Sequence, residues 1–368
     1  MKIPYVNLKK QYLSERNELL KIIDKTLKKG TWVGGDEIAK FEKNITKLCK
    51  TKYCVSLNSG TDALTMALHL VGVKRGDEVI TPPNSFIAST AVIVHLGAKP
   101  IFVDVKDDQN IDENKIEEKI TKKTKAIMPV HLTGRMCNMD RIKKISLKYK
   151  IPIIEDCAQS ILSKYKNKYA GSWGHIGCFS THPLKNLNSM GDGGFITTNS
   201  SYYYNKIKNL RSHGMESTRN NVDDFGYVSR LDNLQAAILN FRLKNIYQII
   251  EKRRINYEIY KKNLNSNHIY FPNERREEYN TYHTFVIQVE KRDKLKNFLK
   301  KKGIDTAIHY PIPIHLQKAG KYLDYTKGSF PIAERQSKKI LSLPINQFLS
   351  RLDIINICKI INKFYEKN

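Results

Sequence analysis

The sequence predicts an α/β protein whose large sheet is mixed or mostly parallel. Short apolar runs alternate with longer amphipathic segments over the first 240 residues, as strands alternate with helices in such folds. Strands that are apolar along their whole length are typical of parallel sheets covered by helices on both faces. After residue 240 the pattern changes, so we expect a large α/β domain at 1–240, with an N-terminal helical segment, and a smaller α+β domain at 241–368.

The alternation predicts individual elements. The expected strands, some with their approach, are "VIVHLGAKPIFVDV" (92–105), "KAIMPVHL" (125–132), "IPIIEDCA" (151–158) and "HIGCFST" (175–181). Helices are expected at 61–73 and 139–150, where apolar residues recur at helical spacing. The elements expected in the second domain are one long amphipathic helix near 240–264, a strand at 281–290, a helix at 293–302 and a proline-rich loop at 309–317.

Composition narrows the class of protein. The hydrophobic share of 40% and the charged share of 27% are those of a globular protein, and no apolar stretch reaches the ~18 residues that span a bilayer. The N-terminus shows no apolar run before a cleavage site, so no signal peptide is expected. Six scattered cysteines without a C-x-x-C pair indicate neither a zinc site nor a disulfide framework. We therefore expect a cytoplasmic protein without a metal site or membrane association.

The net charge of +27 would by itself suggest a nucleic-acid partner. The lysines are spread along the chain as single and paired residues, however, and they accompany an excess of Asn, Ile and Tyr. This distribution is typical of a genome-wide compositional bias, so we expect most lysines to be solvated surface residues. The remainder would help to attract a diphosphate-bearing substrate, and no nucleic-acid binding is expected.

One segment has the form of a phosphate-binding site. In "NSGTDAL" (58–64), Gly60 and Thr61 open the helix expected at 61–73. The free N–H groups and the dipole of a helix start bind phosphate well. A Ser, Thr or Asp before a helix is also an ordinary cap, so this segment alone leaves both interpretations open.

Two further segments carry a carboxylate and an amine. In "IIEDCAQS" (153–160), Glu155 and Asp156 follow an apolar strand, at the edge where open α/β sheets bind ligands. In "FSTHPLKNLNSMGDGGFIT" (179–197), a single lysine, Lys185, lies among small and polar residues ahead of a glycine-rich turn. Burial lowers the pKa of a lysine and makes its amine nucleophilic. Taken singly, the acids can be capping or ion-paired residues and the lysine a surface residue.

The order of the three segments favours a shared function. A phosphate cradle, then Asp156, then Lys185 29 residues later is the set that a pyridoxal phosphate site requires. The helix start anchors the phosphate, the carboxylate keeps the pyridinium nitrogen protonated so that the ring is an electron sink, and the lysine holds the aldehyde carbon.

The chain resembles the DegT/StrS family of sugar aminotransferases, which have the fold-type I architecture of pyridoxal phosphate enzymes. The motifs that carry this resemblance are "IPYVNLKKQY", "GTWVGGDEIAKFE", "NSGTDAL", "PPNSFIAS", "VHLTG", "IIEDCAQS", "FSTHPLKNLNSMGDGGFIT", "SRLDNLQAAIL" and "HYPIPIHLQ". They run almost from end to end of the chain. The resemblance implies a homodimer in which each active site is completed by the second subunit.

The resemblance also implies roles for individual residues. Lys185 is implied to be the Schiff-base lysine, Asp156 the partner of the pyridinium nitrogen, Gln159 a contact of the ring hydroxyl, and Phe86 the residue that stacks on the ring. The implied phosphate contacts are Gly60, Thr61 and Ser180. The candidate contacts of the sugar or its diphosphate are His182, Asn186, Arg230, His309, Tyr310 and His315, the last three of which otherwise belong to a packed loop.

Two positions depart from the family pattern. The family usually has Asn in "GYNxR", where it reaches the cofactor phosphate of the neighbouring subunit, but this chain has Val228 in "GYVSR". Asn186 or Asn233 is a candidate to compensate. His182 stands where an aromatic residue or Asn is common. In the dehydratase relatives a histidine replaces the Schiff-base lysine itself, whereas here Lys185 is kept.

The resemblance implies a reaction in two halves. L-Glutamate gives its amino group to the cofactor, which leaves 2-oxoglutarate and pyridoxamine phosphate, and this amine then passes to a nucleotide-linked keto sugar. "SRLDNLQAA" and "HYPIPIHLQ" resemble the branch that makes 3-amino-3,6-dideoxyhexoses from dTDP-linked 3-keto sugars for glycans such as lipopolysaccharide O-antigen. A 4-keto sugar is the alternative substrate. A non-catalytic regulator or basic scaffold is the alternative class, against which the kept Lys185, Asp156 and Gln159 argue.

Overall fold

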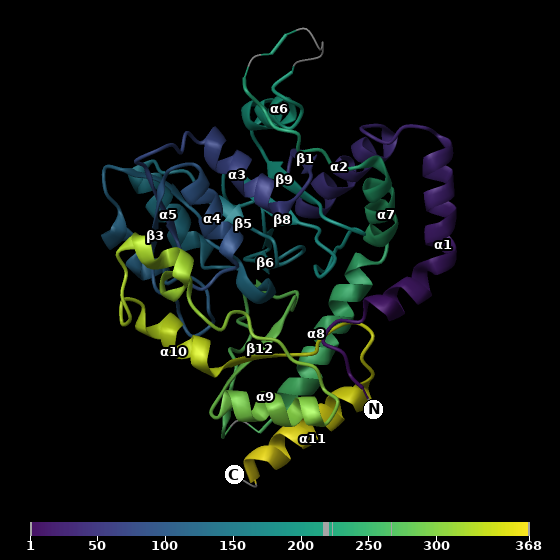
Figure 1. Cartoon of the computed structure of the whole chain (residues 1–368), viewed down its shortest axis with the longest axis vertical. Helices are drawn as coiled ribbons and strands as arrows, with labels where there is room; N and C mark the ends of the chain where they lie inside the picture. Colours follow the sequence, from purple (N-terminus) through teal and green to yellow (C-terminus); the bar gives the residue numbers. More distant parts are fainter. Residues whose placement is uncertain (1, 216–220, 223, 266, 367–368) are drawn as a thin grey trace.

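The computed structural model describes residues 2–215, 221–222, 224–265 and 267–366, and it confirms the α/β class (Figure 1). The large sheet has two parts. One is parallel, in the order β3 (Lys99–Phe102), β2 (Glu78–Thr81) and β4 (Thr124–Ile127). The other has the order β1 (Tyr53–Leu57), β9 (Gly194–Thr198), β8 (Ile176–Ser180) and β5 (Ile154–Asp156).

The two parts form one mixed sheet. Parallel bridges from Ile127 to Ile153 and from Val130 to Asp156 join the β4 side to β5. β5 and β8 are parallel, whereas β9 is antiparallel to both β8 and β1. The carboxyl ends of β1, β2, β4, β5 and β8 therefore meet along one edge, and this is the edge at which α/β sheets bind ligands.

Helices cover both faces of this sheet, as expected for apolar strands. On one face, α3 (Gly60–Leu70), α4 (Ile87–His95) and α6 (Ser201–Leu210) share a core with side chains such as Ile196 of β9. On the other, α2 (Asp36–Cys49), α5 (Met139–Tyr149) and α7 (Asn233–Leu243) share a core with Phe195, the next residue of the same strand. This alternation follows from the two-residue period of a strand. The helix α1 (Leu8–Lys28) stands at the outer edge beside α7 (Figure 1).

The structure corrects two predicted elements. Residues 92–95 are the end of α4 rather than the approach to a strand. Val92 and Ile93 are buried against the sheet, and a short apolar run does not distinguish a buried helix from a buried strand. The long helix expected near 240–264 is two helices, α7 and α8 (Ile246–Asn263). The turn at Lys244 and Asn245 redirects the chain from the first core toward the second.

The C-terminal part forms an antiparallel sheet with its own core. The sheet has the order β10 (Ile269–Tyr270), β12 (Phe285–Val289) and β13 (Ile340–Leu343). The helices of this part are α8, α9 (Arg292–Lys301), α10 (Pro331–Lys339) and α11 (Arg351–Glu366). A separate small sheet links the two parts through β11 (Glu278–Tyr279), β6 (Lys164–Tyr165) and β7 (Lys168–Tyr169). None of the helices in the described ranges is long and apolar enough to cross a membrane.

We propose the domain boundary near residue 240 from the division of the cores. Ile246 and Ile250 still pack in the large core, whereas Tyr257 and Tyr260 begin the C-terminal core. Two segments cross this boundary. Ile3 packs in the C-terminal core and pairs with Ile304. Residues 314–333 pack on Phe102 and Val105 of the large domain.

Glu155, in the middle of β5, is fully buried and holds the loop at 171–174 against the sheet. Its carboxylate accepts hydrogen bonds from the backbone N–H groups of Gly171, Trp173 and Gly174, at 3.1, 2.8 and 2.6 Å. His131 Nε2 lies 3.0 Å from the same carboxylate, and its Nδ1 accepts from the N–H of Cys137. Both ring nitrogens are thereby occupied, so the nearby group of His131, Glu155 and Cys157 is a hydrogen-bonded cluster rather than a metal site.

We expect Glu155→Gln to lower the free energy of unfolding by about 3 kcal/mol, because the amide NH₂ would face donors where the carboxylate accepts. Urea unfolding at neutral pH measures this. The matched control is Glu118→Gln, since Glu118 lies in an exposed pair with Lys119 and such pairs contribute little. Equal stability of the two variants would contradict the role of Glu155.

Candidate active site

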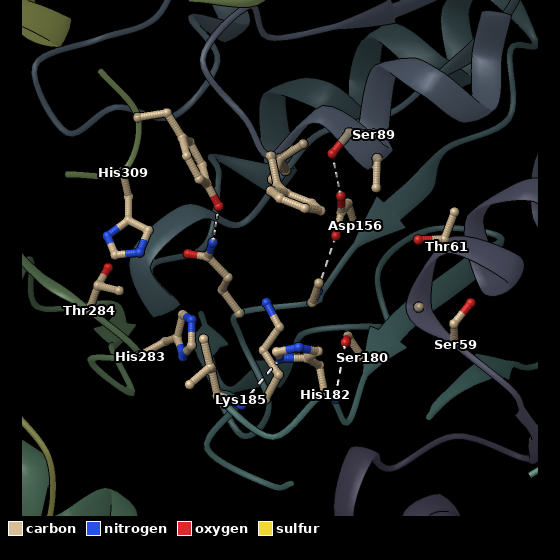
Figure 2. A pocket seen from close by; sticks show the side chains of 18 of the residues that line it. Ser59, Thr61, Ser89, Asp156, Ser180, His182, Lys185, His283, Thr284 and His309 are labelled. Atoms are coloured by element: carbon tan, nitrogen blue, oxygen red, sulfur yellow. Dashed lines mark hydrogen bonds between the residues drawn. The ribbon is translucent and has the colours of Figure 1, made fainter. Parts of the chain in front are cut away.

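The segments that follow four strands of the sheet meet in one cavity of about 410 Å³. They follow β1, β2, β5 and β8, whose carboxyl ends share one edge. Figure 2 shows Ser59 and Thr61 on one side of this cavity, Asp156 and Ser89 above, and Lys185 below. Residues of the C-terminal part, including His283, Thr284 and His309, form the opposite side (Figure 2).

The start of α3 forms an anion-binding end of the cavity. Ser59 caps the helix by accepting from the N–H of Asp62 at 3.0 Å. A Cβ at Gly60 would lie 2.7 Å from the Cβ of Ser180, so only glycine lets the helix start this close to the end of β8. Ser59, Gly60, Thr61 and Ser180 all line the cavity. Free N–H groups and hydroxyls in this arrangement suit a phosphate.

Asp156 is fixed at the end of β5 with its carboxylate at the cavity. It is buried, and it lines the cavity. One carboxylate oxygen accepts from the hydroxyl of Ser89 at 2.7 Å, and the other accepts from the N–H of Ala158 at 3.1 Å. These two bonds prevent the carboxylate from turning away (Figure 2). Because it forms no ion pair with another described residue, its charge is left to stabilise a cation in the cavity.

Lys185 points into the cavity from the turn after β8 (Figure 2). Its backbone N–H donates to the carbonyl of His182 at 2.8 Å, which closes the turn. Burial lowers the pKa of the Lys185 amine from 10.5 to about 8, and the negative charge of Asp156 opposes this shift. The amine is therefore a better nucleophile at neutral pH than an exposed lysine.

The glycine-rich turn after Lys185 serves close packing. A Cβ on Gly193 would collide with the hydroxyl of Thr181, and a Cβ on Gly194 would collide with the backbone of Ser59. The two glycines thus let β9 pass directly beneath the phosphate-binding end of the cavity.

Gln159 and Tyr310 lie between Asp156 and the C-terminal part of the cavity wall. The side-chain oxygen of Gln159 accepts from the N–H of Thr133 at 2.7 Å, which orients its NH₂ group toward Tyr310, at 3.4 Å from the phenol oxygen. Phe86 stands at the mouth of the cavity, exposed, with its ring 6.0 Å from that of Tyr310. Phe86 and Gln159 both line the cavity.

The structure divides the predicted sugar contacts into two groups. His182, His309 and Tyr310 line the cavity. Asn186, Arg230 and His315 do not line it. His315 is buried in the C-terminal part, where its Nε2 lies 3.0 Å from Glu334 and its ring packs on Phe330. These contacts correspond to the packed-loop interpretation of this histidine.

The two residues proposed to compensate for Val228 do not line this cavity. Asn186 donates to the carbonyl of Thr281 at 3.2 Å, and Asn233 donates to the carbonyl of Thr31 at 2.8 Å. Val228 is exposed on the surface and pairs with Ser212 in a short bridge. The position that departs from the family pattern is therefore turned toward solvent rather than toward this cavity.

Several cavity residues were not predicted from the sequence. They are Tyr5, Ser89, Arg253, His283, Thr284 and Asn346. Most come from the N-terminal segment or the C-terminal part, far from the three motifs along the chain. The sequence offered a signal for four of them: Tyr5 and Ser89 lie in the motifs "IPYVNLKKQY" and "PPNSFIAS", and His283 and Thr284 are a polar pair at the entry to the predicted strand 281–290.

Comparisons with known proteins agree with this geometry. A model of the DegT/DnrJ/EryC1/StrS aminotransferase family matches residues 13–362. The chain is 38% identical over 363 residues to the dTDP-3-amino-3,6-dideoxy-alpha-D-galactopyranose transaminase of Aneurinibacillus thermoaerophilus, with 98% of this chain and 99% of that protein covered. It is 36% identical over 369 residues to a "pleiotropic regulatory protein" of Geobacillus stearothermophilus, with 99% of both covered.

Solved structures agree as well. The crystal structure of S. venezuelae DesV in complex with a ketimine intermediate has a TM-score of 0.96, with 33% identity and 99% of each chain covered. Other similar structures are described as the pyridoxal phosphate form of a "putative sugar aminotransferase" from Streptococcus pneumoniae and as a Bacillus subtilis protein with bound pyridoxamine phosphate. The helix start at Gly60, the carboxylate of Asp156 and the amine of Lys185 fit that cofactor, since they offer a phosphate site, an anion and a nucleophile around one cavity. The chain therefore belongs to the DegT/DnrJ/EryC1/StrS family of pyridoxal phosphate-dependent sugar aminotransferases.

Proposed function

We propose that this nucleotide-sugar aminotransferase moves the amino group of L-glutamate to a dTDP-linked 3-keto-6-deoxyhexose in the cytoplasm. The observation that carries the aminotransferase reaction is the convergence of Lys185 and Asp156 on one cavity beside a phosphate-binding helix start. The sugar rests on the relative at 38% identity, whose name places the amino group at carbon 3 of a dTDP sugar. Other relatives are named for UDP-linked and GDP-linked sugars, so the dTDP group is a proposal too, and a 4-keto sugar is the alternative substrate.

Each of the main cavity residues is proposed to have a separate role in this reaction. When bound, pyridoxal phosphate supplies the electron sink that lets the hydrogen leave the carbon beside the nitrogen. Asp156, held by Ser89 and Ala158, would stabilise the protonated ring nitrogen. Lys185 would hold the cofactor, and its released neutral amine would carry the proton between the substrate carbon beside the nitrogen and the cofactor carbon on the other side of that nitrogen. The helix start at Gly60 would hold the phosphate throughout.

His309 and Tyr310 are proposed to bind the sugar as neutral groups. Burial, with the positive charge of Lys185, lowers the pKa of His309 to about 4, so its imidazole is uncharged at neutral pH. Its Nδ1 lies 2.8 Å from the hydroxyl of Ser342. Burial also raises the pKa of Tyr310, which keeps the phenol as a hydrogen-bond donor. Both groups suit sugar hydroxyls better than a diphosphate, which needs positive charge.

The substrate is tested by incubating the purified enzyme with L-glutamate and a panel of dTDP-, UDP- and GDP-linked 3-keto and 4-keto sugars. We expect the mass of the 3-amino product from the dTDP-linked 3-keto-6-deoxyhexose, at the highest turnover of the panel. Lys185→Ala is the control and should give no product with any sugar. A clear preference for a 4-keto sugar would replace the proposed substrate with its alternative.

The lowered pKa of Lys185 predicts the pH dependence of cofactor uptake. Only the neutral amine attacks the aldehyde, so the uptake rate of cofactor-free protein should rise about tenfold per pH unit and level off above pH about 8. Stopped-flow absorbance of added pyridoxal phosphate measures this rate. The rate constant of the unprotonated amine of Nα-acetyl-lysine, measured at each pH, corrects this rate for the ionisation of the cofactor itself. A rate that still rises near pH 10 would show that Lys185 has an ordinary pKa.

We also propose that the enzyme works as a homodimer. Large apolar side chains are exposed along α1 and just after it, and at the cavity, among them Leu13, Leu20, Trp32, Phe86 and Leu184. Phe86 and Leu184 line the cavity as well, so a subunit that covered this surface would also close the active site. An interface of the size typical for permanent dimers, above ~2,000 Å², would bury them.

Val228→Asn tests this arrangement across the interface. Since the exposed Val228 offers no hydrogen bond, restoring the family asparagine should add about 1–2 kcal/mol and tighten cofactor binding about tenfold in the dimer. Equilibrium dialysis of pyridoxal phosphate measures the affinity, and light scattering confirms the oligomeric state. Val222→Asn, at another exposed valine, is the matched control. Unchanged or weaker affinity in Val228→Asn would contradict the loss of a contact at this position.

A further inference from the structure

A buried arginine lies in the wall of the active-site cavity without a carboxylate partner. Arg253 projects from α8 and is 6% exposed. The other buried arginines of the described chain each pair with an acid: Arg135 with Glu278, Arg242 with Glu15, and Arg292 with Asp293. Arg253 alone among them forms no ion pair with a described residue. Burying a charge without a counter-ion lowers the stability of the fold, which indicates that Arg253 has a function other than stabilising the free protein.

The hydrogen bonds of Arg253 leave part of its guanidinium unused. Nη1 donates to the carbonyls of Tyr282 and His283 at 3.0 and 3.2 Å, and Nη2 lies 3.5 Å from the side-chain oxygen of Gln347. Nε is buried and has no hydrogen-bond partner in the described parts of the chain. All of the acceptors are neutral, while a guanidinium has five N–H donors. Burial lowers the pKa of Arg253 only to about 10, so the group stays a cation at neutral pH.

Arg253 lies close to the reactive amine. It lines the main cavity together with Lys185, and both residues also line a small recess that includes Asn346. The positive charges of Lys185 and Arg253 both help to lower the pKa of His283, after burial. Figure 2 shows His283 beside Lys185, on the side of the cavity opposite Ser59 and Thr61. The unpaired cation is therefore next to the lysine and away from the phosphate-binding end.

We propose that Arg253 binds the α-carboxylate of the amino donor. This inference rests on the proposed use of an amino acid as donor. In an amino acid the α-carboxylate is attached to the carbon that carries the amine, and this amine takes the place of Lys185. The carboxylate must therefore lie beside Lys185, and Arg253 lines this part of the cavity with a guanidinium whose hydrogen bonds leave some of its N–H groups unused. A guanidinium is the side chain best matched to a carboxylate, because its planar N–H groups bind both oxygens at once.

Measuring the two half-reactions separately distinguishes binding of the donor carboxylate by Arg253 from a structural role or binding of the diphosphate. We expect Arg253→Gln to raise the half-saturating concentration of L-glutamate about 100-fold in the first half-reaction, since a hydrogen-bonded charge pair is lost. The second half-reaction, from the pyridoxamine form and the keto sugar, should keep its half-saturating concentration within twofold. For Arg253→Lys, the half-saturating concentration of L-glutamate should lie between those of the wild type and Arg253→Gln, because lysine keeps the positive charge but loses the two parallel N–H donors of the guanidinium. Single-turnover absorbance of the cofactor measures each half separately.

The neighbouring arginine provides the matched control. Arg254 lies on the same helix but pairs with Glu274, at 2.8 Å, outside the cavity. Arg254→Gln should leave both half-saturating concentrations unchanged. Equal losses in both half-reactions for Arg253→Gln, with a lower melting temperature of the ligand-free protein, would assign Arg253 a structural role and overturn the proposal. A rise confined to the nucleotide sugar would assign it to the diphosphate and overturn the proposal as well.

A binding measurement without turnover completes the test. 2-Oxoglutarate does not react with the pyridoxal phosphate form, but it presents the same carboxylates, and binding to the native state raises the melting temperature. We expect this rise in the wild-type protein and in Arg254→Gln, and none in Arg253→Gln. A wild-type enzyme that accepts no amino group from L-glutamate overturns the proposed donor. If the enzyme does not use L-glutamate, the melting temperatures still test Arg253. An equal rise with 2-oxoglutarate in the wild type and Arg253→Gln would overturn the role of Arg253, and a rise that is lost only in Arg253→Gln would support it.

Discussion

The parallel pairing of β5 with β8 is the constraint on which the active site depends. In this register Asp156 lies opposite Cys178, so β5 ends with a carboxylate while β8 continues to Ser180 and into the turn that carries Lys185. The carboxylate and the amine thus come from neighbouring strands and reach the same cavity. A shift by one residue would turn Asp156 to the opposite face of the sheet, and Glu155 would take its place.

Glu155 and Asp156 show how adjacent carboxylates acquire different roles. Glu155 points to the face where three backbone N–H groups and His131 surround it, and it holds structure together. Asp156 points to the other face and receives only two hydrogen bonds, from Ser89 and Ala158. Its remaining capacity is available to a ligand. The number of donors that the fold places around each carboxylate thereby separates a structural acid from a functional one.

The number of partners also distinguishes the positively charged side chains of the cavity. Lys185 is half-buried and Arg253 is buried, neither forms an ion pair with a described residue, and desolvation lowers the pKa of each. An enzyme gains from such groups because a charge that is left unsatisfied in the free protein can be satisfied by a substrate or cofactor. Figure 2 shows Lys185 away from Ser59 and Thr61 at the helix start, and Arg253 lines a small recess together with Lys185. The cavity therefore has separate places for a phosphate at one end and a carboxylate at the other.

The amino-acid sequence by itself determined the α/β class, the order of the phosphate cradle, the carboxylate and the lysine, and the family. These depend on local patterns: apolar strands, a glycine at a helix start, and short motifs with fixed spacing. It did not reveal the break between α7 and α8, because both helices continue one amphipathic pattern and only their different cores separate them. Nor did it identify Arg253 or distinguish the buried His315 from the cavity-lining His309. Those distinctions depend on which distant segments come together, and only the tertiary structure decides whether a polar side chain meets a partner or an open cavity.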